Sequence, residues 1–239
     1  MKIMTKVAAV MLAMAVVFPI IGQDQASAYS WTRNLQEGSN GADVKELQIR
    51  VAGWAADSAS KTYVSTDGAF GPGTKAAVIR FQKAYGLTAD GVVGPATQAK
   101  LNSLEASDGS TQNFNFSEFQ SKDGSGFSNG NVAAATVKEN VRKLMYKLEA
   151  VRKKAGNSAI TVNSGFRSLS HNASVGGASN SQHTYGIAAD IVVGGYTPTA
   201  VANLAKSSGF SGVIIYSTFT HVDSRVEYPS YGASSYYWP

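Results

Sequence analysis

Residues 181–193 read Ser181-Gln182-His183-Thr184-Tyr185-Gly186-Ile187-Ala188-Ala189-Asp190-Ile191-Val192-Val193. The β-branched run after Asp190 predicts a strand, and the glycine before it predicts a loop that carries His183. A histidine on such a loop and a carboxylate at the start of the next strand can meet around one ion. The stretch therefore predicts a sheet with part of a metal site where this strand begins.

A second imidazole follows in the run Phe219-Thr220-His221-Val222-Asp223, which pairs naturally with a predicted strand at Gly212-Val213-Ile214-Ile215-Tyr216. The chain has only three histidines, at positions 171, 183 and 221. Two imidazoles and one carboxylate, from His183, Asp190 and His221, make a three-ligand set that leaves a fourth position for water. That arrangement is typical of catalytic rather than structural zinc sites.

The surrounding second half of the chain mixes helical and strand patterns. Apolar residues at helical spacing predict a helix over 136–154, and residues 197–208 also follow a helical pattern. Residues 159–162 predict a strand that leads into Ser164-Gly165-Phe166-Arg167. This mixture predicts an α+β domain in which helices pack against an antiparallel sheet.

The first half contains an internal repeat. The run Asp67-Gly68-Ala69-Phe70-Gly71-Pro72-Gly73-Thr74 returns as Asp90-Gly91-Val92-Val93-Gly94-Pro95-Ala96-Thr97, and both copies lead into helix-like sequence. In each copy Asp-Gly predicts a tight turn, and the threonine is placed to cap the helix that follows. We expect one helix over 74–85 and another that begins within 41–48, so the segment predicts a small three-helix bundle.

The N-terminus has the pattern of an export signal over residues 1–28, with two early lysines, an apolar run over 7–21 and small residues at Ala26-Ser27-Ala28. We therefore expect an exported protein that begins near Tyr29 and has no membrane span once the signal is removed. The chain has no cysteine, which excludes disulfides, thiolate zinc sites and cysteine nucleophiles.

Composition changes along the chain predict its domains. We expect a helical domain over 29–104, a linker over 105–113 that offers little to bury, and the α+β domain over 114–239. Removal of residues 1–28 takes away two lysines and Asp24 and lowers the formal charge from +5 to +4. A positive charge favours an anionic partner, but the basic residues are scattered, which argues against nucleic acid and favours the anionic polymers of a bacterial wall.

Motifs in both domains match known families. The first domain carries Gly41-xx-Val44-xx-Leu47-Gln48, Asp67-Gly68-xx-Gly71-Pro72-xx-Thr74 and Arg80-Phe81-Gln82. Over residues 38–101 these motifs resemble the peptidoglycan-binding domain of wall hydrolases.

The second domain carries Ser164-Gly165-Phe166-Arg167-Ser168, His171-Asn172, Val175-Gly176-Gly177-Ala178, Ser181-Gln182-His183-xx-Gly186-xx-Ala189-Asp190 and His221-Val222-Asp223-Ser224-Arg225. Over roughly residues 114–227 these stretches together resemble the zinc D-alanyl-D-alanine carboxypeptidase family.

The second resemblance implies that His183, Asp190 and His221 bind one zinc ion. It also implies that Arg167 faces the substrate, where its planar cation could hold a carboxylate or steady a developing oxyanion. The implied activity is hydrolysis of D-amino-acid-containing stem peptides of bacterial peptidoglycan by a monomeric enzyme, with D-Ala-D-Ala carboxypeptidase as the leading hypothesis. An L-alanyl-D-glutamate endopeptidase and a wall-binding protein without turnover remain as alternatives.

The predicted mechanism also needs a general base. Asp223 is the candidate because residues two apart on a strand point to the same face, which here is that of His221. In several relatives an acidic residue or a histidine lies two or three residues before the last histidine ligand, whereas Phe219 and Thr218 stand at these positions here. Asp223 could instead orient His221 or pair with Arg225.

Two further polar residues are candidates for substrate contact. His171 lies in a Ser- and Gly-rich loop and could line the substrate cleft or only brace the loop. Ser181 could hydrogen-bond a zinc ligand or the substrate. No Gly-x-Ser-x-Gly elbow surrounds Ser181, so serine-peptidase chemistry is not expected.

Overall fold

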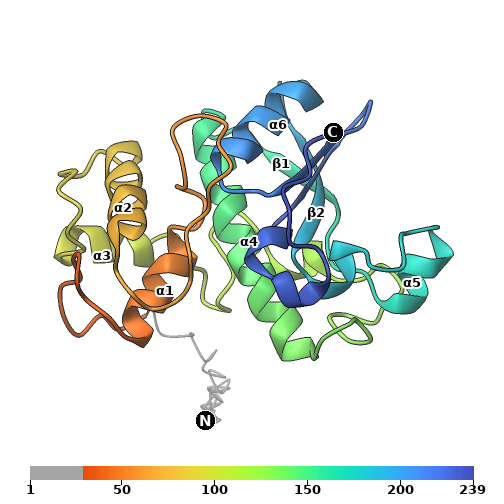
Figure 1. The fold of residues 1–239 in the computed structure, drawn as a ribbon, viewed down its shortest axis with the longest axis horizontal. Coiled ribbons are helices and arrows are strands. Elements are labelled where there is room, and N and C mark those ends of the chain that lie inside the picture. Colours follow the sequence, from red (N-terminus) through yellow and green to blue (C-terminus); the bar gives the residue numbers. More distant parts are fainter. Residues whose placement is uncertain (1–28) are drawn as a thin grey trace, which may run out of the picture.

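The computed structural model describes residues 29–239, and the predicted export signal lies outside the described residues. Figure 1 shows two parts of the chain side by side, a helical part and a larger part built around a sheet. The long helix α4, Ala134–Lys154, lies between them. Within residues 29–239, no helix has the length and apolar character needed to cross a membrane.

The helical part contains α1 (Ala42–Arg50), α2 (Pro72–Ala84) and α3 (Pro95–Asn102). These helices enclose a continuous apolar core. Its buried side chains include Val44, Leu47, Val78, Phe81 and Leu101. The predicted three-helix bundle is confirmed, because the apolar residues spaced along each helix meet in one core.

A buried glutamine closes each copy of the sequence repeat. The side-chain nitrogen of Gln48 donates to Asp67 Oδ1, Ala69 O and Thr74 Oγ1, and its side-chain oxygen accepts from Gly68 N. Gln82 makes the same set of contacts in the second copy, with Asp90, Val92, Thr97 and Gly91. The repeat in the sequence is therefore a repeat of one hydrogen-bond network.

The threonines of the repeat do not cap the helices that follow. Each helix begins at the proline of its Gly-Pro pair, with the glycine as N-cap. Thr74 and Thr97 lie inside the first turns, where their hydroxyls accept from Gln48 and Gln82. The N-cap prediction is wrong because proline suits the first helical position and starts each helix earlier.

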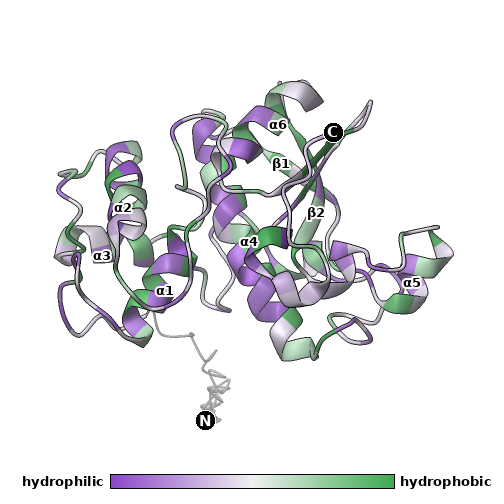
Figure 2. Cartoon of the chain, viewed as in Figure 1, coloured by the Kyte–Doolittle hydropathy of each residue, from purple (hydrophilic) through white to green (hydrophobic). Residues whose placement is uncertain are grey.

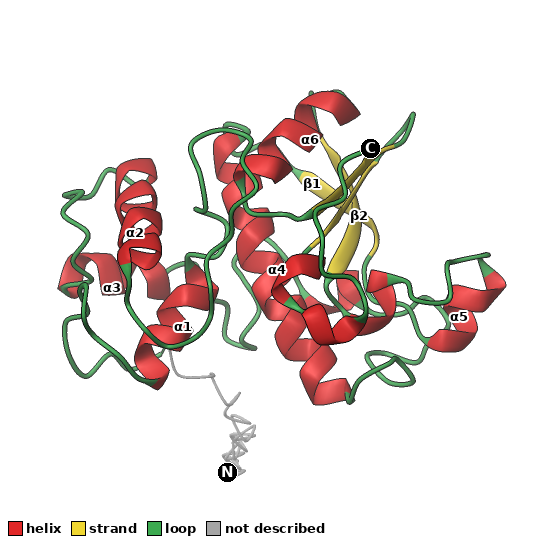
Figure 3. Ribbon diagram, viewed as in Figure 1, coloured by secondary structure: helices red, strands yellow, loops and turns green. Residues whose placement is uncertain are grey.

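The larger part is built on a four-stranded antiparallel sheet with the order β1-β2-β4-β3. The strands are β1 (Ile160–Ser164), β2 (Ala188–Val193), β3 (Gly212–Ile215) and β4 (Thr220–Asp223). Helices α4 and α6 (Pro198–Ser207) share one apolar core with these strands. Figure 3 shows both helices beside the sheet. The predicted α+β class with an antiparallel sheet is confirmed.

Short helices occupy the loops around this sheet. The connection from β1 to β2 carries α5 (Leu169–Ser174) and the 3₁₀ helix η2 (Gln182–Tyr185). A further 3₁₀ helix, η1 (Phe116–Phe119), precedes α4, and η3 (Arg225–Glu227) and η4 (Pro229–Tyr231) follow β4. The loops that carry η2 and η3 flank the strands that hold the candidate ligands.

Helix α4 is buried on two sides. Val141, Leu144 and Leu148 belong to the core shared with the sheet, whereas Ala150 belongs to the core of the helical part. Figure 2 shows hydrophobic and hydrophilic residues alternating along α4. The two parts of the molecule therefore pack directly on each other through this helix.

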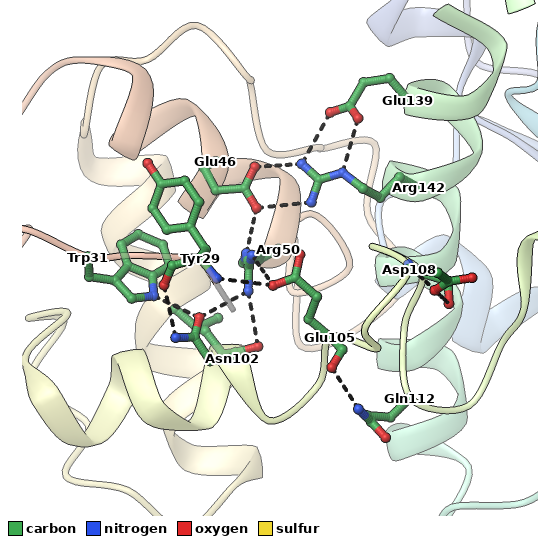
Figure 4. Close-up of polar contacts among 12 residues, drawn as sticks. Tyr29, Trp31, Glu46, Arg50, Asn102, Glu105, Asp108, Gln112, Glu139 and Arg142 are labelled. Atoms are coloured by element: carbon green, nitrogen blue, oxygen red, sulfur yellow. Dashed lines mark hydrogen bonds and ion pairs between the residues drawn. The ribbon is translucent and has the colours of Figure 1, made fainter. Parts of the chain in front are cut away.

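Ion pairs reinforce the packing around α4 (Figure 4). Glu46 of α1 accepts from both terminal nitrogens of Arg142 on α4, at 2.9 and 2.5 Å, and from Arg50 at 2.6 Å. At the end of α4, the ammonium of Lys154 donates to Ala56 O and Ser207 O. Contacts of this kind join the two parts by directional bonds as well as by apolar contact.

The segment predicted as a linker also lies against α4. Both side-chain oxygens of Glu149 accept from Asn113, and Ser110 and Thr111 are buried. Composition predicts a segment with almost nothing to bury, because small polar residues dominate it. In the structure this segment buries Ser110 and Thr111 and is held to α4 through Asn113, so it is partly packed rather than free.

Candidate metal centre

Three elements of the larger part place the candidate ligands. His183 lies in η2, Asp190 in β2 and His221 in β4. Asp190 and His221 stand opposite each other in the antiparallel register, which brings their side chains together on one face of the sheet. Asp190 lies within β2 rather than at its start, because the strand already begins at Ala188.

The ligand atoms of the three residues converge on one point. His183 Nε2 lies 3.2 Å from His221 Nδ1 and 3.3 Å from Asp190 Oδ1, and His221 Nδ1 lies 2.9 Å from the same oxygen. One ligand atom from each residue lies within 4.8 Å of the others, close enough to hold one metal ion. Two imidazole nitrogens and a carboxylate oxygen are an ordinary zinc donor set.

Hydrogen bonds outside the cluster fix which nitrogen of each imidazole is free. His183 Nδ1 donates to Gly165 O at 2.6 Å, and His221 Nε2 donates to Asp223 Oδ2 at 3.1 Å. Each ring therefore carries its proton on the far nitrogen and directs a lone pair toward Asp190. The residues fit a zinc ion, because both imidazoles are held in the tautomer that a metal needs.

The cluster is enclosed and its charge is balanced. Relative exposure is 3% for His183, 7% for Asp190 and 8% for His221. Burial lowers the pKa of His183, which favours the neutral imidazole. Burial alone would raise the pKa of Asp190, but its close contacts with the imidazoles of His183 and His221 hold that pKa below its ordinary range. The carboxylate is therefore kept ionised, as a metal ligand must be.

Arg167 lies beside the cluster and contacts it directly. Its Nη2 donates to Asp190 Oδ2 at 2.7 Å, and its Nε donates to Ser164 Oγ at 2.9 Å. One oxygen of Asp190 thus faces the imidazoles while the other binds the guanidinium. Arg167 also lines the cavity above the cluster, so one side chain can both orient a ligand and face a substrate.

A cavity of about 480 Å³ lies over the ligand cluster. Its walls come from the loop before η2, from the β3–β4 hairpin and from the segment after β4. Beside the cluster and Arg167, its lining includes Ser181, Gln182, Tyr216, Phe219 and Arg225. The candidate ligands therefore sit at the base of a space that can take a short peptide end.

The structure brings some predicted site residues to this cavity and not others. Ser181 lines it, as predicted, but His171 and Asp223 are not among its lining residues. The backbone N–H of His171 donates to Ser168 Oγ at the start of α5. This position favours the loop-bracing alternative for His171.

Asp223 is fully buried behind the cluster. Its carboxylate accepts from His221 Nε2 and from Arg225, whose Nη2 lies 2.6 Å from Oδ2. Hydrogen bonds from His221 and Arg225 keep the pKa of Asp223 low against the opposing effect of burial. This geometry favours the orienting role for Asp223 over the role of general base.

Sequence reasoning missed several residues of the site. The carbonyl of Gly165 carries no sequence signal, because any residue has one. Tyr216 and Phe219 stack at the tip of the β3–β4 hairpin with ring centroids 4.4 Å apart. The sequence feature that could have identified these two residues is their position on either side of the predicted hairpin turn next to His221.

Comparisons with known proteins agree with this geometry. A family model described as "Peptidase M15" matches residues 112–223, and one described as "Putative peptidoglycan binding domain" matches residues 40–101. The zinc D-Ala-D-Ala carboxypeptidase of Streptomyces albus G is 47% identical over 186 residues, which cover 78% of this chain and 71% of that protein.

Two solved structures are also similar over part of the chain. A peptidoglycan-binding protein from Clostridioides difficile is 40% identical, with a TM-score of 0.26, and the match covers 30% of this chain and 42% of that one. The endolysin of a Burkholderia phage, AP3, is 26% identical with the same TM-score of 0.26, and the match covers 46% of this chain and 37% of that one.

Proposed function

Because the chain belongs to the peptidase M15 family, we propose that it removes the terminal D-alanine from peptidoglycan stem peptides as a D-Ala-D-Ala carboxypeptidase. The chain is a zinc metallopeptidase with a peptidoglycan-binding domain. The name of the Streptomyces albus G relative supports the choice of bond, and its similarity extends over most of this chain.

The observation that carries the proposal is the direction of three lone pairs. Nε2 of His183 and Nδ1 of His221 both face Oδ1 of Asp190. The other nitrogen of each ring is held by a hydrogen bond that faces away from Asp190. We assign His183, Asp190 and His221 as the zinc ligands. Because all three residues line the cavity, a zinc ion held by them would have room to bind water there, which suits hydrolysis.

The roles of the neighbouring residues follow from their contacts. When bound, Zn²⁺ supplies Lewis-acid polarisation of the scissile carbonyl and activation of a water molecule. Arg167 stabilises negative charge on the carbonyl oxygen, because its guanidinium lies beside Asp190 and faces the same cavity. Asp223 holds His221 in its binding tautomer, and Ser181 contacts the substrate from the cavity wall.

The protein acts on the bacterial cell wall, outside the cell. We propose that residues 1–28 direct its export and are then removed, and that the mature protein acts there as a monomer on peptidoglycan. We also assign residues 29–104 to the wall-binding domain, 105–113 to the connection and 114–239 to the peptidase domain. The packing of both domains on α4 implies that wall binding presents the peptidase cavity in a fixed direction rather than on a loose tether.

The experiment compares two histidine variants of the same protein. Zinc content and release of D-alanine from a pentapeptide muropeptide are measured for wild type, His183→Ala and His171→Ala. We expect His183→Ala to lose both zinc and D-alanine release, because it removes a ligand. His171→Ala is the matched control and should keep both, since His171 lies outside the cavity lining.

Product masses separate the alternatives. Loss of one alanine confirms the carboxypeptidase, whereas cleavage between L-alanine and D-glutamate identifies the endopeptidase instead. A wild-type protein that binds zinc and cuts no peptide would reject the proposed activity altogether.

A further inference from the structure

Tyr29 is held at a fixed place by its backbone and by its ring (Figure 4). Its carbonyl accepts from Asn102 Nδ2 at 3.0 Å, and its nitrogen lies 3.4 Å from Glu105 Oε2. Its ring meets that of Trp31 edge-on at 4.6 Å, and the guanidinium of Arg50 lies 5.5 Å from its ring centroid. The nitrogen of Tyr29 therefore cannot leave Glu105 without breaking several other contacts.

Glu105 is one end of a chain of ion pairs that reaches α4. Arg50 joins Glu105 to Glu46, and Arg142 joins Glu46 to Glu139. These three carboxylates and two guanidiniums leave one negative charge in excess. Side-chain exposure is 1% for Arg50 and 15% for Glu105, so water screens this end of the network only weakly.

The sequence places a processing pattern directly before Tyr29. The small residues Ala26-Ser27-Ala28 end the predicted export signal. Hydrolysis of the Ala28–Tyr29 bond by an export-processing peptidase adds water across that bond, leaving a carboxylate on Ala28 and an ammonium on Tyr29 at neutral pH. A neutral N–H beside Glu105 thereby becomes a cation with two further hydrogens.

We propose that processing between Ala28 and Tyr29 creates an ammonium group that pairs with Glu105 and completes the ion network between the wall-binding domain and α4. The proposal rests on the export proposed above but on no catalytic step. The new positive charge cancels the excess negative charge of the network. The processed protein is therefore held together more firmly than a chain in which Tyr29 is still an amide.

The contribution of this pair depends on pH in a defined direction. An α-ammonium has an ordinary pKa of about 8, and pairing with a carboxylate favours its charged form in the folded state. The stabilisation is therefore fully present below about pH 7 and is lost as pH rises above 8. The charged and titratable groups around it are Glu105 after α3, Arg50 and Glu46 on α1, and Arg142 and Tyr146 on α4.

The test is a thermodynamic cycle that does not depend on enzyme activity. Melting temperatures are measured at pH 6 for chains that begin at Tyr29 with a free or an acetylated amine, each with Glu105 or with Glu105→Gln. We expect acetylation to lower the melting temperature by about 2 °C in the Glu105 chain. Acetylation should have no effect in the Glu105→Gln chain, because the partner charge is absent.

A second variant guards against a general effect of acetylation. A chain with one glycine added before Tyr29 keeps the positive charge but moves it by about 3.8 Å, so it should also melt lower. Equal melting of the free and acetylated chains, or the same loss with Glu105→Gln, would overturn the pairing. The mass of the exported protein tests the processing step: a chain that starts at Tyr29 is expected, and any other start rejects the assigned bond.

Discussion

At the scale of single residues, the site depends on hydrogen bonds that face away from the cavity. Gly165 O and Asp223 each bind the far nitrogen of an imidazole, so His183 offers Nε2 and His221 offers Nδ1. A ring free to rotate would lose entropy on binding a metal and could offer either nitrogen. The outer hydrogen bonds therefore convert two ordinary histidines into directed ligands.

Replacement of Asp223 by asparagine tests this orienting role. We expect Asp223→Asn to weaken zinc affinity about 10- to 100-fold, because His221 loses a charged partner that fixes its tautomer. At saturating zinc, kcat should stay near the wild-type value. Metal titration and kinetics at saturating zinc measure the two effects separately, and Asp57→Asn at an exposed carboxylate is the control. A large loss of kcat with zinc fully bound would restore the base role.

The sequence could predict that three candidate zinc ligands come together, as the structure shows, but not the hydrogen bonds that hold them. The spacing of His183, Asp190 and His221 is visible because each residue type is rare or chemically distinct in its context. The sequence offers contacts of Asp223 with His221 and Arg225 only as an alternative to the base role, and the structure shows that both contacts form and that Asp223 lies outside the cavity lining. The carbonyl of Gly165 is reached only because β1 ends beside η2 in the folded sheet.

At the scale of elements, the repeat of the wall-binding domain depends on Gln48 and Gln82. Each glutamine satisfies a turn aspartate, a backbone carbonyl, a threonine hydroxyl and a glycine N–H. Both side chains are almost fully buried, at 0% and 1% exposure. A buried amide with all its groups paired fixes the turn against the helix more specifically than an apolar residue could.

Replacement of Gln82 by leucine tests how much this hydrogen-bond network contributes to the free energy of unfolding. We expect Gln82→Leu to lower the free energy of unfolding by about 2–4 kcal/mol, because several buried partners lose their hydrogen bonds at once. Gln36→Leu, at an exposed position, is the matched control and should change stability by less than about 0.5 kcal/mol. Denaturant unfolding measures both variants, and equal stability of the two would show that the network adds nothing.

The same element shows where local prediction succeeds and fails. Apolar spacing predicts a helix over 74–85, and the structure has it over Pro72–Ala84. Thr74 was a reasonable N-cap by residue type, yet its hydroxyl binds Gln48, which is distant in sequence. A cap depends on neighbours in the chain, whereas this contact depends on how α1 and α2 pack, so only the structure reveals it.

At the scale of the whole molecule, the two domains are packed rather than tethered. Composition predicts a free linker because residues 105–113 are small and polar, but it carries no information on whether flanking domains touch. The contact is decided by surfaces far apart in sequence, such as Ala150 on α4 and Gly53 after α1. Long-range packing of this kind is therefore hard to predict from the spacing of residues within a short segment.

Gly53 marks the closest approach of the two domains. A Cβ at this position would lie 2.5 Å from Ala150 Cβ and 2.9 Å from Lys147 Cα, closer than real side chains pack. We expect Gly53→Ala to lower the free energy of unfolding by about 1–3 kcal/mol, because the domains must move apart. Gly73→Ala meets no atom within 4 Å and should be neutral or stabilising. Thermal melting compares them, and an unchanged Gly53→Ala would mean that the interface yields freely.

Lys154 gives the domain interface a dependence on pH. Burial lowers the pKa of Lys154 from 10.5 to about 8, while its ammonium still donates to Ser207 O at 3.0 Å and to Ala56 O at 3.3 Å. Between pH 8 and 10.5 the unfolded chain binds this proton and the folded chain does not, so stability rises with pH in that window.

A comparison with Lys154→Met isolates this effect from other titrating groups. From pH 7 to 9.5 the unfolding free energy of wild type relative to the variant should rise by about 2 kcal/mol, the value of roughly 1.5 pKa units. Denaturant unfolding at several pH values measures the difference directly. If the difference in unfolding free energy stays flat or falls with pH, Lys154 keeps its proton in the folded protein. The hydrogen bonds to the surrounding carbonyl oxygens would then offset the cost of burying its charge.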